Sequence, residues 1–314
     1  MEVVKQVDDA PRRLMRISLS PKVRHQAEPY LLILPALLLL AVVVLYPAAT
    51  AIRLSFEHYV LTEAGDRRFV GLANYIQALS DPYFALALKN SVLWVGSNLI
   101  LQLVLGLGVA LVLNADFPLR GLVRGVILVP WVTPSVVAAL MWRFLLDPSR
   151  GIVNDALVRL GILESPVPFI SQPATAFGAV VVASVWFGVP FFAVMLLAGL
   201  QAIPEEIYQA ATVDGATGLR SFWHITLPLL MPTILITTLL RTLWLSQYVD
   251  IIFLLTGGGP ARATTTLPVH AFLIARAQLD FGYASAIAMS LAVVLTLVAC
   301  IYLTVLRRTG NSLR

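Results

Sequence analysis

The chain has 314 residues, of which 59% are hydrophobic and only 12% charged, and its net charge is +5. Soluble domains carry about 25% charged residues, so this composition excludes an ordinary soluble protein. Basic residues gather near the two ends without aromatic platforms, which argues against nucleic-acid binding, and the single cysteine, Cys300, excludes an internal disulfide.

Long apolar segments recur along the chain, each about as long as an α-helix needs to be to cross a membrane. They cover roughly residues 30–56, 88–113, 123–146, 174–202, 229–256 and 283–306. We therefore predict an all-α, polytopic membrane protein with six transmembrane helices. Its single membrane domain is expected at residues 30–306, between a tail at 1–29 and a shorter tail at 307–314.

The distribution of Lys and Arg predicts the orientation of these spans. An even number of spans places both tails on one side, and that side carries more basic residues, mainly in the tail before the first span. The positive-inside rule then predicts cytoplasmic termini and a cytoplasmic connection at residues 203–228. On the other side, short helices are expected at residues 69–76 and 151–161. We expect them to pack at the rim of the bilayer rather than to bind a ligand.

The polar stretch at residues 204–228 lies between two apolar spans and is expected to form a compact pair of helices. Pro204 suits the first helical position, and the two acidic residues after it favour the positive end of the helix dipole. Gly215 can end this helix in a left-handed conformation. A second short helix is expected at residues 219–225 and should end at Pro228. An ordinary loop hairpin is the simple alternative.

The pattern Gln-Ala-Ala-x3-Gly-x9-Ile-x-Leu-Pro, which begins at Gln209, resembles the cytoplasmic loop motif of membrane subunits of binding-protein-dependent ABC importers. That family has Glu in the first position, and Gln can still form a hydrogen bond there. The resemblance implies that this loop docks in a cleft on an ATPase subunit. The residues it assigns to coupling are Glu205, Glu206, Gln209, Ala210, Ala211, Asp214, Gly215, Ile225, Leu227 and Pro228.

Further segments along nearly the whole chain are similar to carbohydrate-import permeases. They are Leu-Tyr-Pro at 45–47, Gly-Leu-Ala-Asn-Tyr at 71–75, Val-Pro-Trp at 129–131 and Leu-Thr-Gly-Gly-Gly-Pro at 255–260. The last of these looks like the maltose-type F subunit and the glycerol-phosphate-type A subunit. The resemblance implies the type I ABC-importer permease fold.

The chain is not expected to be an enzyme or the motor of transport. A P-loop needs a lysine directly after a glycine, and none of the lysines follows one. No cofactor is expected in this chain. The resemblance implies that ATP and Mg are bound by two partner ATPase subunits.

Aromatic and polar side chains inside the third, fourth and fifth spans are candidates for a substrate path. Sugars present apolar C–H faces and hydroxyl edges, so their sites combine aromatic stacking with a few hydrogen-bonding groups. The candidates are Trp131, Ser135, Ser184, Gly188, Phe191, Arg241, Trp244 and Tyr248. The simple alternative is that these aromatics fill the helix-bundle core or the interfacial belt. Asn98 and Gln102 are expected to hydrogen-bond between helices.

Arg241 is costly inside a membrane unless it is paired, and Asp250 is too far along the same span to pair with it. The arginine is therefore expected to face an aqueous cavity or a sister subunit. It would also suit a phosphorylated substrate. The segment Gly-Val-Pro at 188–190 is expected to bend or break the fourth span.

The leading hypothesis is a sugar-importing ABC permease subunit in the bacterial inner membrane. Its expected partners are a homologous second permease, two ATPase subunits, a periplasmic binding protein and membrane lipid, without nucleic acid. Glycerol 3-phosphate or a polyol is the alternative substrate. An ion-driven secondary transporter is the alternative of a different class, although Asp250 is the only acidic residue inside a span. A membrane enzyme or scaffold is disfavoured because no catalytic constellation is present.

Overall fold

The computed structural model describes residues 21–63 and 65–312, so the expected tail up to residue 20 lies outside the described residues. Its contacts divide the chain into two units, residues 1–50 and 51–314. The first unit contains α1 (Pro21–Leu40) and a π-helical turn (Ala41–Leu45). The boundary falls within α2 (Tyr46–Ser55). The π-helical turn precedes Pro47, which cannot donate to the regular helical ladder.

The second unit contains the remaining elements. In chain order these are β1 (Glu57–His58), β2 (Arg68–Phe69), α3 (Ala73–Ser80), α4 (Pro82–Asn114), α5 (Arg120–Val132), α6 (Ser135–Leu145), α7 (Ile152–Arg159), α8 (Pro173–Gln201), α9 (Glu205–Val213), α10 (Gly218–Ser221), a π-helical turn (Phe222–Thr226), α11 (Leu227–Leu245), α12 (Asp250–Thr256), α13 (Leu267–Leu273), a π-helical turn (Ile274–Gln278) and α14 (Phe281–Ser312). The strands β1 and β2 form a small antiparallel hairpin. The fold is otherwise helical, as predicted.

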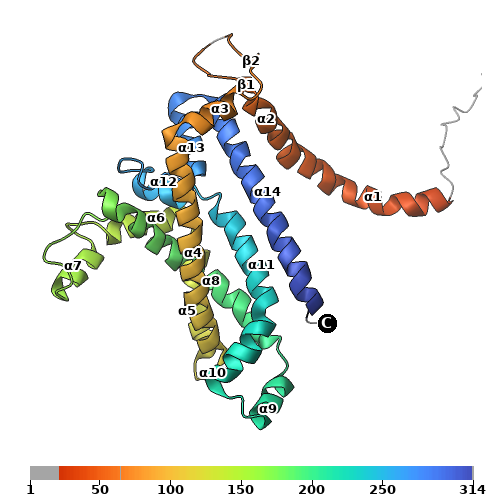
Figure 1. Cartoon of the computed structure of the whole chain (residues 1–314), viewed down its shortest axis with the longest axis vertical. Helices are drawn as coiled ribbons and strands as arrows, with labels where there is room; N and C mark the ends of the chain where they lie inside the picture. The colour runs from red at the N-terminus through yellow and green to blue at the C-terminus, as the bar shows by residue number, and fades with distance from the viewer. Residues whose placement is uncertain (1–20, 64, 313–314) are drawn as a thin grey trace, which may run out of the picture. The chain divides into compact units, whose positions relative to one another are not determined.

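Helix α8 is the centre of the second unit. It packs against α4, α5 and α11, which run beside it in Figure 1. Its apolar window is 67% buried, whereas the corresponding windows of α4 and α14 are 22% and 11% buried. Small residues allow this close packing; Gly106 of α4, for example, lies directly against Phe192 of α8. The exposed apolar faces of the outer helices suit a lipid or protein environment.

Among the residues that the structure describes, five helices can cross a membrane by length and composition, or six if one bent pair counts as a single span. The predicted first, second, fourth and sixth spans correspond to such helices: Leu32–Ser55, Pro82–Asn114, Pro173–Gln201 and Phe281–Leu306. The fourth continues through Pro190, so the expected break at 188–190 is absent.

The third predicted span, 123–146, is wrong as a continuous helix. Helices α5 and α6 meet at a bend of 94°. Thr133 has an extended backbone, and Pro134 follows it. The proline ring disfavours a helical conformation in the residue before it, which is the physical reason for the bend.

The fifth predicted span, 229–256, is also wrong as a single helix. The crossing helix runs over Gly218–Leu245, which begins earlier, and α12 starts only at Asp250 after a turn. Ser246 ends α11 and its hydroxyl hydrogen-bonds to the carbonyl of Thr242. The apolar character of residues 251–255 conceals this break in the sequence.

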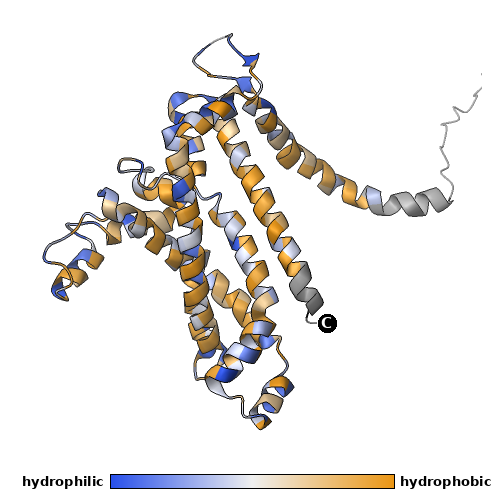
Figure 2. Cartoon of the chain, in the orientation of Figure 1, coloured by the Kyte–Doolittle hydropathy of each residue, from blue (hydrophilic) through white to orange (hydrophobic). Residues whose placement is uncertain are grey.

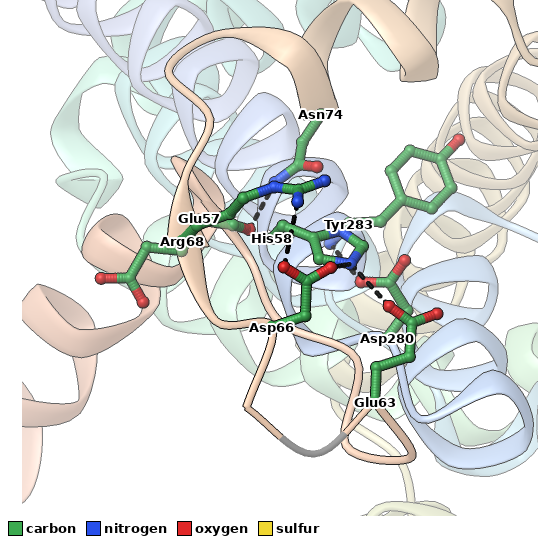
Figure 3. A network of polar contacts seen from close by, with 8 residues as sticks. All are labelled: Glu57, His58, Glu63, Asp66, Arg68, Asn74, Asp280 and Tyr283. Atoms are coloured by element: carbon green, nitrogen blue, oxygen red, sulfur yellow. Dashed lines mark hydrogen bonds and ion pairs between the residues drawn. The ribbon is translucent and has the colours of Figure 1, made fainter.

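The short elements near the hairpin hold the ends of the long helices. Helix α3 begins at Ala73, later than expected, because Phe69 belongs to β2. The side-chain amide of Asn74 donates to the carbonyls of Ser55 and Glu57 and so ties α3 to the hairpin (Figure 3). The expected helix at 151–161 is confirmed as α7.

Candidate functional site

Three aromatic candidates from three different helices lie together. Trp131 is in the last turn of α5, Phe191 is in α8, and Trp244 is in the last turn of α11. The ring centroid of Phe191 is 5.9 Å from that of Trp131 and 4.9 Å from that of Trp244. Phe191 is buried, but Trp131 and Trp244 remain 40% and 43% exposed. The cluster therefore has a packed base and two indole rings with accessible faces.

Arg241 lies one turn from Trp244 on α11 and is only 1% exposed. Its Nε donates to Oε1 of Gln102 at 2.7 Å, and its Nη1 lies 3.5 Å from the Tyr248 hydroxyl. Its Nη2 is buried without a hydrogen-bond partner. Within residues 21–63 and 65–312, Arg241 has no carboxylate partner.

A chain of buried amides holds this arginine in place. Gln102 donates from Nε2 to Oδ1 of Asn98 at 2.9 Å and to the carbonyl of Ser184 at 3.1 Å. Because Gln102 also accepts from Arg241, it connects α4 to both α8 and α11. The predicted interhelical role of Gln102 is therefore seen in the structure, whereas Asn98 bonds within α4.

Gly188 allows the arginine to approach α8 closely. A Cβ atom at this position would overlap with Nη2 of Arg241 and with the side-chain amide of Gln102. It leaves space for a close contact between helices.

Arg241, Gln102 and Tyr248 form an arginine cluster, and a small cavity lies beside it. Its lining residues are Ser135, Ser184, Phe187, Tyr248 and Ile251. The Ser184 hydroxyl is buried without a hydrogen-bond partner, and Ser135 donates to Oδ2 of Asp250 at 3.3 Å. Asp250 was not predicted as a site residue, because only the broken fifth span places it opposite the first residue of α6. A larger cavity, about 500 Å³, lies elsewhere between α6, α7 and α8 and is almost wholly apolar.

The predicted loop between the fourth and fifth spans forms a helix that ends sharply. Helix α9 closes with Gly215 at φ +73°, and the amide of Ala216 donates to the carbonyl of Ala211 at 2.8 Å. This is a Schellman-type end, for which glycine is favoured. Pro204 is wrong as the first helical residue, because it adopts an extended backbone and caps α9 one position earlier.

Most of the predicted coupling residues in this helix are accessible. Those exposed are Glu205, Glu206, Gln209, Ala210, Asp214 and Gly215. Ala211 is buried. The hydroxyls of Tyr208 and Thr226 lie 3.1 Å apart and fasten α9 to the start of the next crossing helix.

The second predicted helix does not end at Pro228. Residues 218–245 form one continuous helical segment, with a π-helical turn just before this proline. Pro228 lies inside this segment, directly after the π-helical turn, and its missing N–H removes one backbone hydrogen bond there. Ile225 and Leu227 are half-buried beside it.

Exposed apolar side chains on the same loop were missed in the sequence. Val213 is 88% exposed, and Leu219 and Trp223 are also largely accessible. Figure 2 shows polar residues gathered around α9 and α10, beyond the apolar lengths of α4 and α11. Large apolar residues inside a polar segment could have indicated this exposed surface from the sequence.

The β1–β2 hairpin brings together one histidine and two carboxylates, although their spacing in the sequence is not typical of a metal site. Ligand atoms of His58, Glu63 and Asp66 lie within 4.8 Å of one another. Nε2 of His58 is 2.8 Å from Glu63, and Arg68 is paired with Asp66 at 3.0 Å (Figure 3). These part-exposed ion pairs account for the cluster, and such pairs contribute about 0–1 kcal/mol each.

A second polar group lies at the start of α4. Nε2 of His270 is 3.4 Å from Oδ2 of Asp81, which also accepts from the Tyr283 hydroxyl at 2.8 Å. Burial lowers the pKa of His270, nearby Arg262 adds to the lowering, and Asp81 opposes it. Burial raises the pKa of Asp81, but hydrogen bonds from the Tyr83 amide and Tyr283, with His270, leave it below its usual value.

Comparison with known proteins identifies the class to which this arrangement belongs. Residues 102–311 match the family of binding-protein-dependent transport system inner membrane components. The chain is 38% identical to the trehalose/maltose transport system permease protein MalF of Thermococcus litoralis, over 90% of this chain and 95% of the relative. It is 37% identical to the sulfoquinovosyl glycerol transport system permease protein SmoG of Agrobacterium fabrum, over 88% and 89% of the two chains.

The fold agrees with this relationship. A chain of a bacterial ABC transporter involved in the import of the acidic polysaccharide alginate superposes with a TM-score of 0.80 at 22% identity. The match covers 91% of this chain and 98% of the other. A bacterial alginate ABC transporter in complex with an alginate pentasaccharide-bound periplasmic protein gives a TM-score of 0.79 at 22% identity. The chain belongs to the family of binding-protein-dependent inner-membrane permeases and has the ABC-importer permease fold.

Proposed function

We propose that this chain is the permease subunit of an ATP-driven importer of a sugar or sugar derivative. The observation that carries the proposal is the cluster of Trp131, Phe191 and Trp244, which joins three helices beside the polar groups of Arg241 and Tyr248. Aromatic faces next to a few hydrogen-bonding groups suit the C–H faces and hydroxyls of a sugar. Relatives named for trehalose/maltose and sulfoquinovosyl glycerol transport support the same substrate class.

The substrate path is proposed to combine the aromatic cluster with the arginine cluster. Trp131 and Trp244 would stack on the sugar, and Ser135, Ser184 and Tyr248 would offer hydroxyls. Gly188 would keep Arg241 close to α8. The exposed indole faces support a path completed by a second, homologous permease subunit, because one chain leaves them uncovered.

The energy for transport is proposed to enter through residues 203–228. Two ATPase subunits would bind ATP and Mg, and one of them would receive α9. The exposed face of α9 and its fixed end support this role, because a rigid helix can transmit a movement that a flexible loop would absorb. A periplasmic binding protein would deliver the sugar, a proposal supported by the solved alginate transporter with its periplasmic protein.

Uptake of labelled trehalose or maltose into vesicles that contain the complete importer tests the proposal. Uptake should require ATP inside and the binding protein outside, and it should persist when an uncoupler collapses ion gradients. Trp244→Ala should lower the uptake rate about tenfold, because stacking of a planar ligand on an aromatic side chain is worth on the order of 1–3 kcal/mol. Phe144→Ala is the matched control, because Phe144 is an exposed aromatic of α6 outside the cluster.

Two outcomes would reject parts of this proposal. Uptake that stops with the uncoupler and needs no ATP would indicate an ion-driven transporter. Equal uptake by the Trp244→Ala and Phe144→Ala variants would remove the aromatic cluster from the substrate path.

A further inference from the structure

Arg241 is a buried positive charge without a counter-ion in the part of the chain that the structure describes. Two of its nitrogens contact neutral groups, on Gln102 and Tyr248, and Nη2 has no acceptor. An arginine stays charged in proteins, and burying an uncompensated charge costs several kcal/mol. The site is therefore electrostatically incomplete, and an anion would complete it.

The groups around the arginine form a receptor of the right kind. Ser184 and Gly188 lie one turn apart on the same face of α8, and Gly188 gives Nη2 the space it needs. The buried Ser184 hydroxyl also lacks a partner and lines the small cavity with Tyr248. Tyr248 links this cavity to the guanidinium, and the cavity volume of about 10 Å³ admits a single oxygen atom, such as one oxygen of an oxyanion.

We propose that Arg241, with the hydroxyls of Ser184 and Tyr248, binds an oxyanion on the transported molecule: a carboxylate, sulfonate or phosphate group. This inference rests on the proposed function and specifies its substrate class as an acidic sugar or polyol. Trp244 lies three residues from Arg241 on the same helix, so the two side chains are neighbours. One substrate can therefore stack its ring on the indole while its acidic group reaches the guanidinium.

Other ways of completing the site lead to different results. A neutral sugar hydroxyl could accept from Nη2, but it would leave the charge uncompensated. A carboxylate from the second permease would neutralise the arginine permanently and would remove any preference for acidic ligands in the assembled importer.

Binding of three probes to the assembled importer tests the inference. The importer is purified through a tag on this chain, so that partner subunits remain bound, and is placed in nanodiscs. Glucose, glucose 6-phosphate and glucuronate are titrated while tryptophan fluorescence is followed. Both acidic probes should bind about tenfold or more tightly than glucose, because hydrogen bonds to charged groups are the stronger ones.

Variants assign the preference to Arg241. Arg241→Gln should lower the affinities for the two acidic probes to that for glucose. Arg241→Lys should retain part of the preference for the acidic probes. Arg143→Gln removes the same charge from an exposed position in α6 and should leave all three affinities unchanged. If Arg241→Gln does not fold, the test still rests on the affinities of the wild-type importer for the three probes and on the Arg241→Lys variant.

The inference is overturned if the wild-type importer binds the three probes equally or binds none of them. It is also overturned if Arg241→Gln keeps the acidic preference. ATP-driven uptake of a neutral sugar alongside any of these results would leave the proposed function intact. An importer that takes up neither neutral nor acidic sugars would instead overturn the proposed function.

Discussion

Gly188 shows how one missing side chain determines an interhelical contact. The guanidinium of Arg241 and the amide of Gln102 occupy the space where a Cβ atom at this position would lie. Neither polar group can withdraw without losing the hydrogen bond that joins them. Substitution here is therefore expected to force α4, α8 and α11 apart, in contrast to glycines that face open space.

Replacing Gly188 by Ala is expected to destabilise the protein by about 1–3 kcal/mol, the usual range for overpacking. The midpoint of heat-induced aggregation in detergent measures the effect. Gly178→Ala is the matched control, because Gly178 lies in the same helix and nothing approaches the position of its Cβ. Equal midpoints for the two variants would contradict the tight fit described for Gly188.

The contact between His270 and Asp81 is expected to make stability depend on pH. Burial lowers the pKa of His270 from its ordinary value of 6.5, so the unfolded chain binds a proton that the folded chain resists. Stability should therefore be complete above about pH 6.5 and should fall as the pH decreases through the folded-state pKa. The lowered pKa of Asp81 acts in the same direction, but below its ordinary value of 3.8.

Thermal unfolding between pH 7.5 and 5 measures the contribution of His270. The variant His270→Asn keeps a polar side chain but cannot titrate, so its midpoint should vary less with pH over this interval. Arg262 and Tyr283 are unchanged in this comparison. The same slope in both proteins would show that another group is responsible.

Individual helices were predictable where apolar length alone decides the structure. The second, fourth and sixth spans agree with α4, α8 and α14, although Pro190 gave a competing signal in the fourth. The third and fifth spans do not, because helix breaks at residues 133–134 and 246–249 lie inside apolar sequence. Apolar length predicts that a segment enters the membrane, but local backbone restrictions decide whether it crosses as one helix.

The site was predictable residue by residue but not in its connections. Aromatic and polar residues inside spans indicated Trp131, Phe191 and Trp244, yet their contact requires the packing of three helices. The link between Ser135 and Asp250 requires two broken helices to meet end to end. Such contacts depend on tertiary structure, and no spacing within the chain encodes them.

At the scale of an element, Gly215 is expected to be essential for the loop at residues 203–228. Its backbone has φ +73°, which costs other residues about 1–2 kcal/mol, and a bulky side chain would project from the exposed end of α9. Gly215→Trp should therefore abolish ATP-driven uptake while the protein still inserts into the membrane. Uptake and membrane-extracted protein are measured in the same vesicles.

Gly161 provides the control for this variant. It has φ +69° and open space around it, but it follows α7 in a different connection. Gly161→Trp introduces the same strain and bulk and should retain most of the uptake. Normal uptake by Gly215→Trp would remove the coupling role from the end of α9.

The whole molecule is expected to have both termini in the cytoplasm, an orientation that two accessible positions can test. Val213 is 88% exposed at the end of α9, and Leu160 is 73% exposed after α7. In a Cys300→Ser background, a membrane-impermeant maleimide should label Leu160→Cys in intact spheroplasts. It should label Val213→Cys only after permeabilisation, and the reverse pattern would invert the orientation.

The bend between α5 and α6 has a consequence for the barrier that the protein presents to small ions. These helices are about 20 Å and 16 Å long at 1.5 Å per residue, so neither alone crosses a hydrocarbon layer of about 30 Å. The backbone groups freed at the bend must meet water or protein, because lipid tails offer no hydrogen bonds. Water that reaches this depth shortens the insulating layer, so the importer must keep the remaining thickness sealed whenever it is idle.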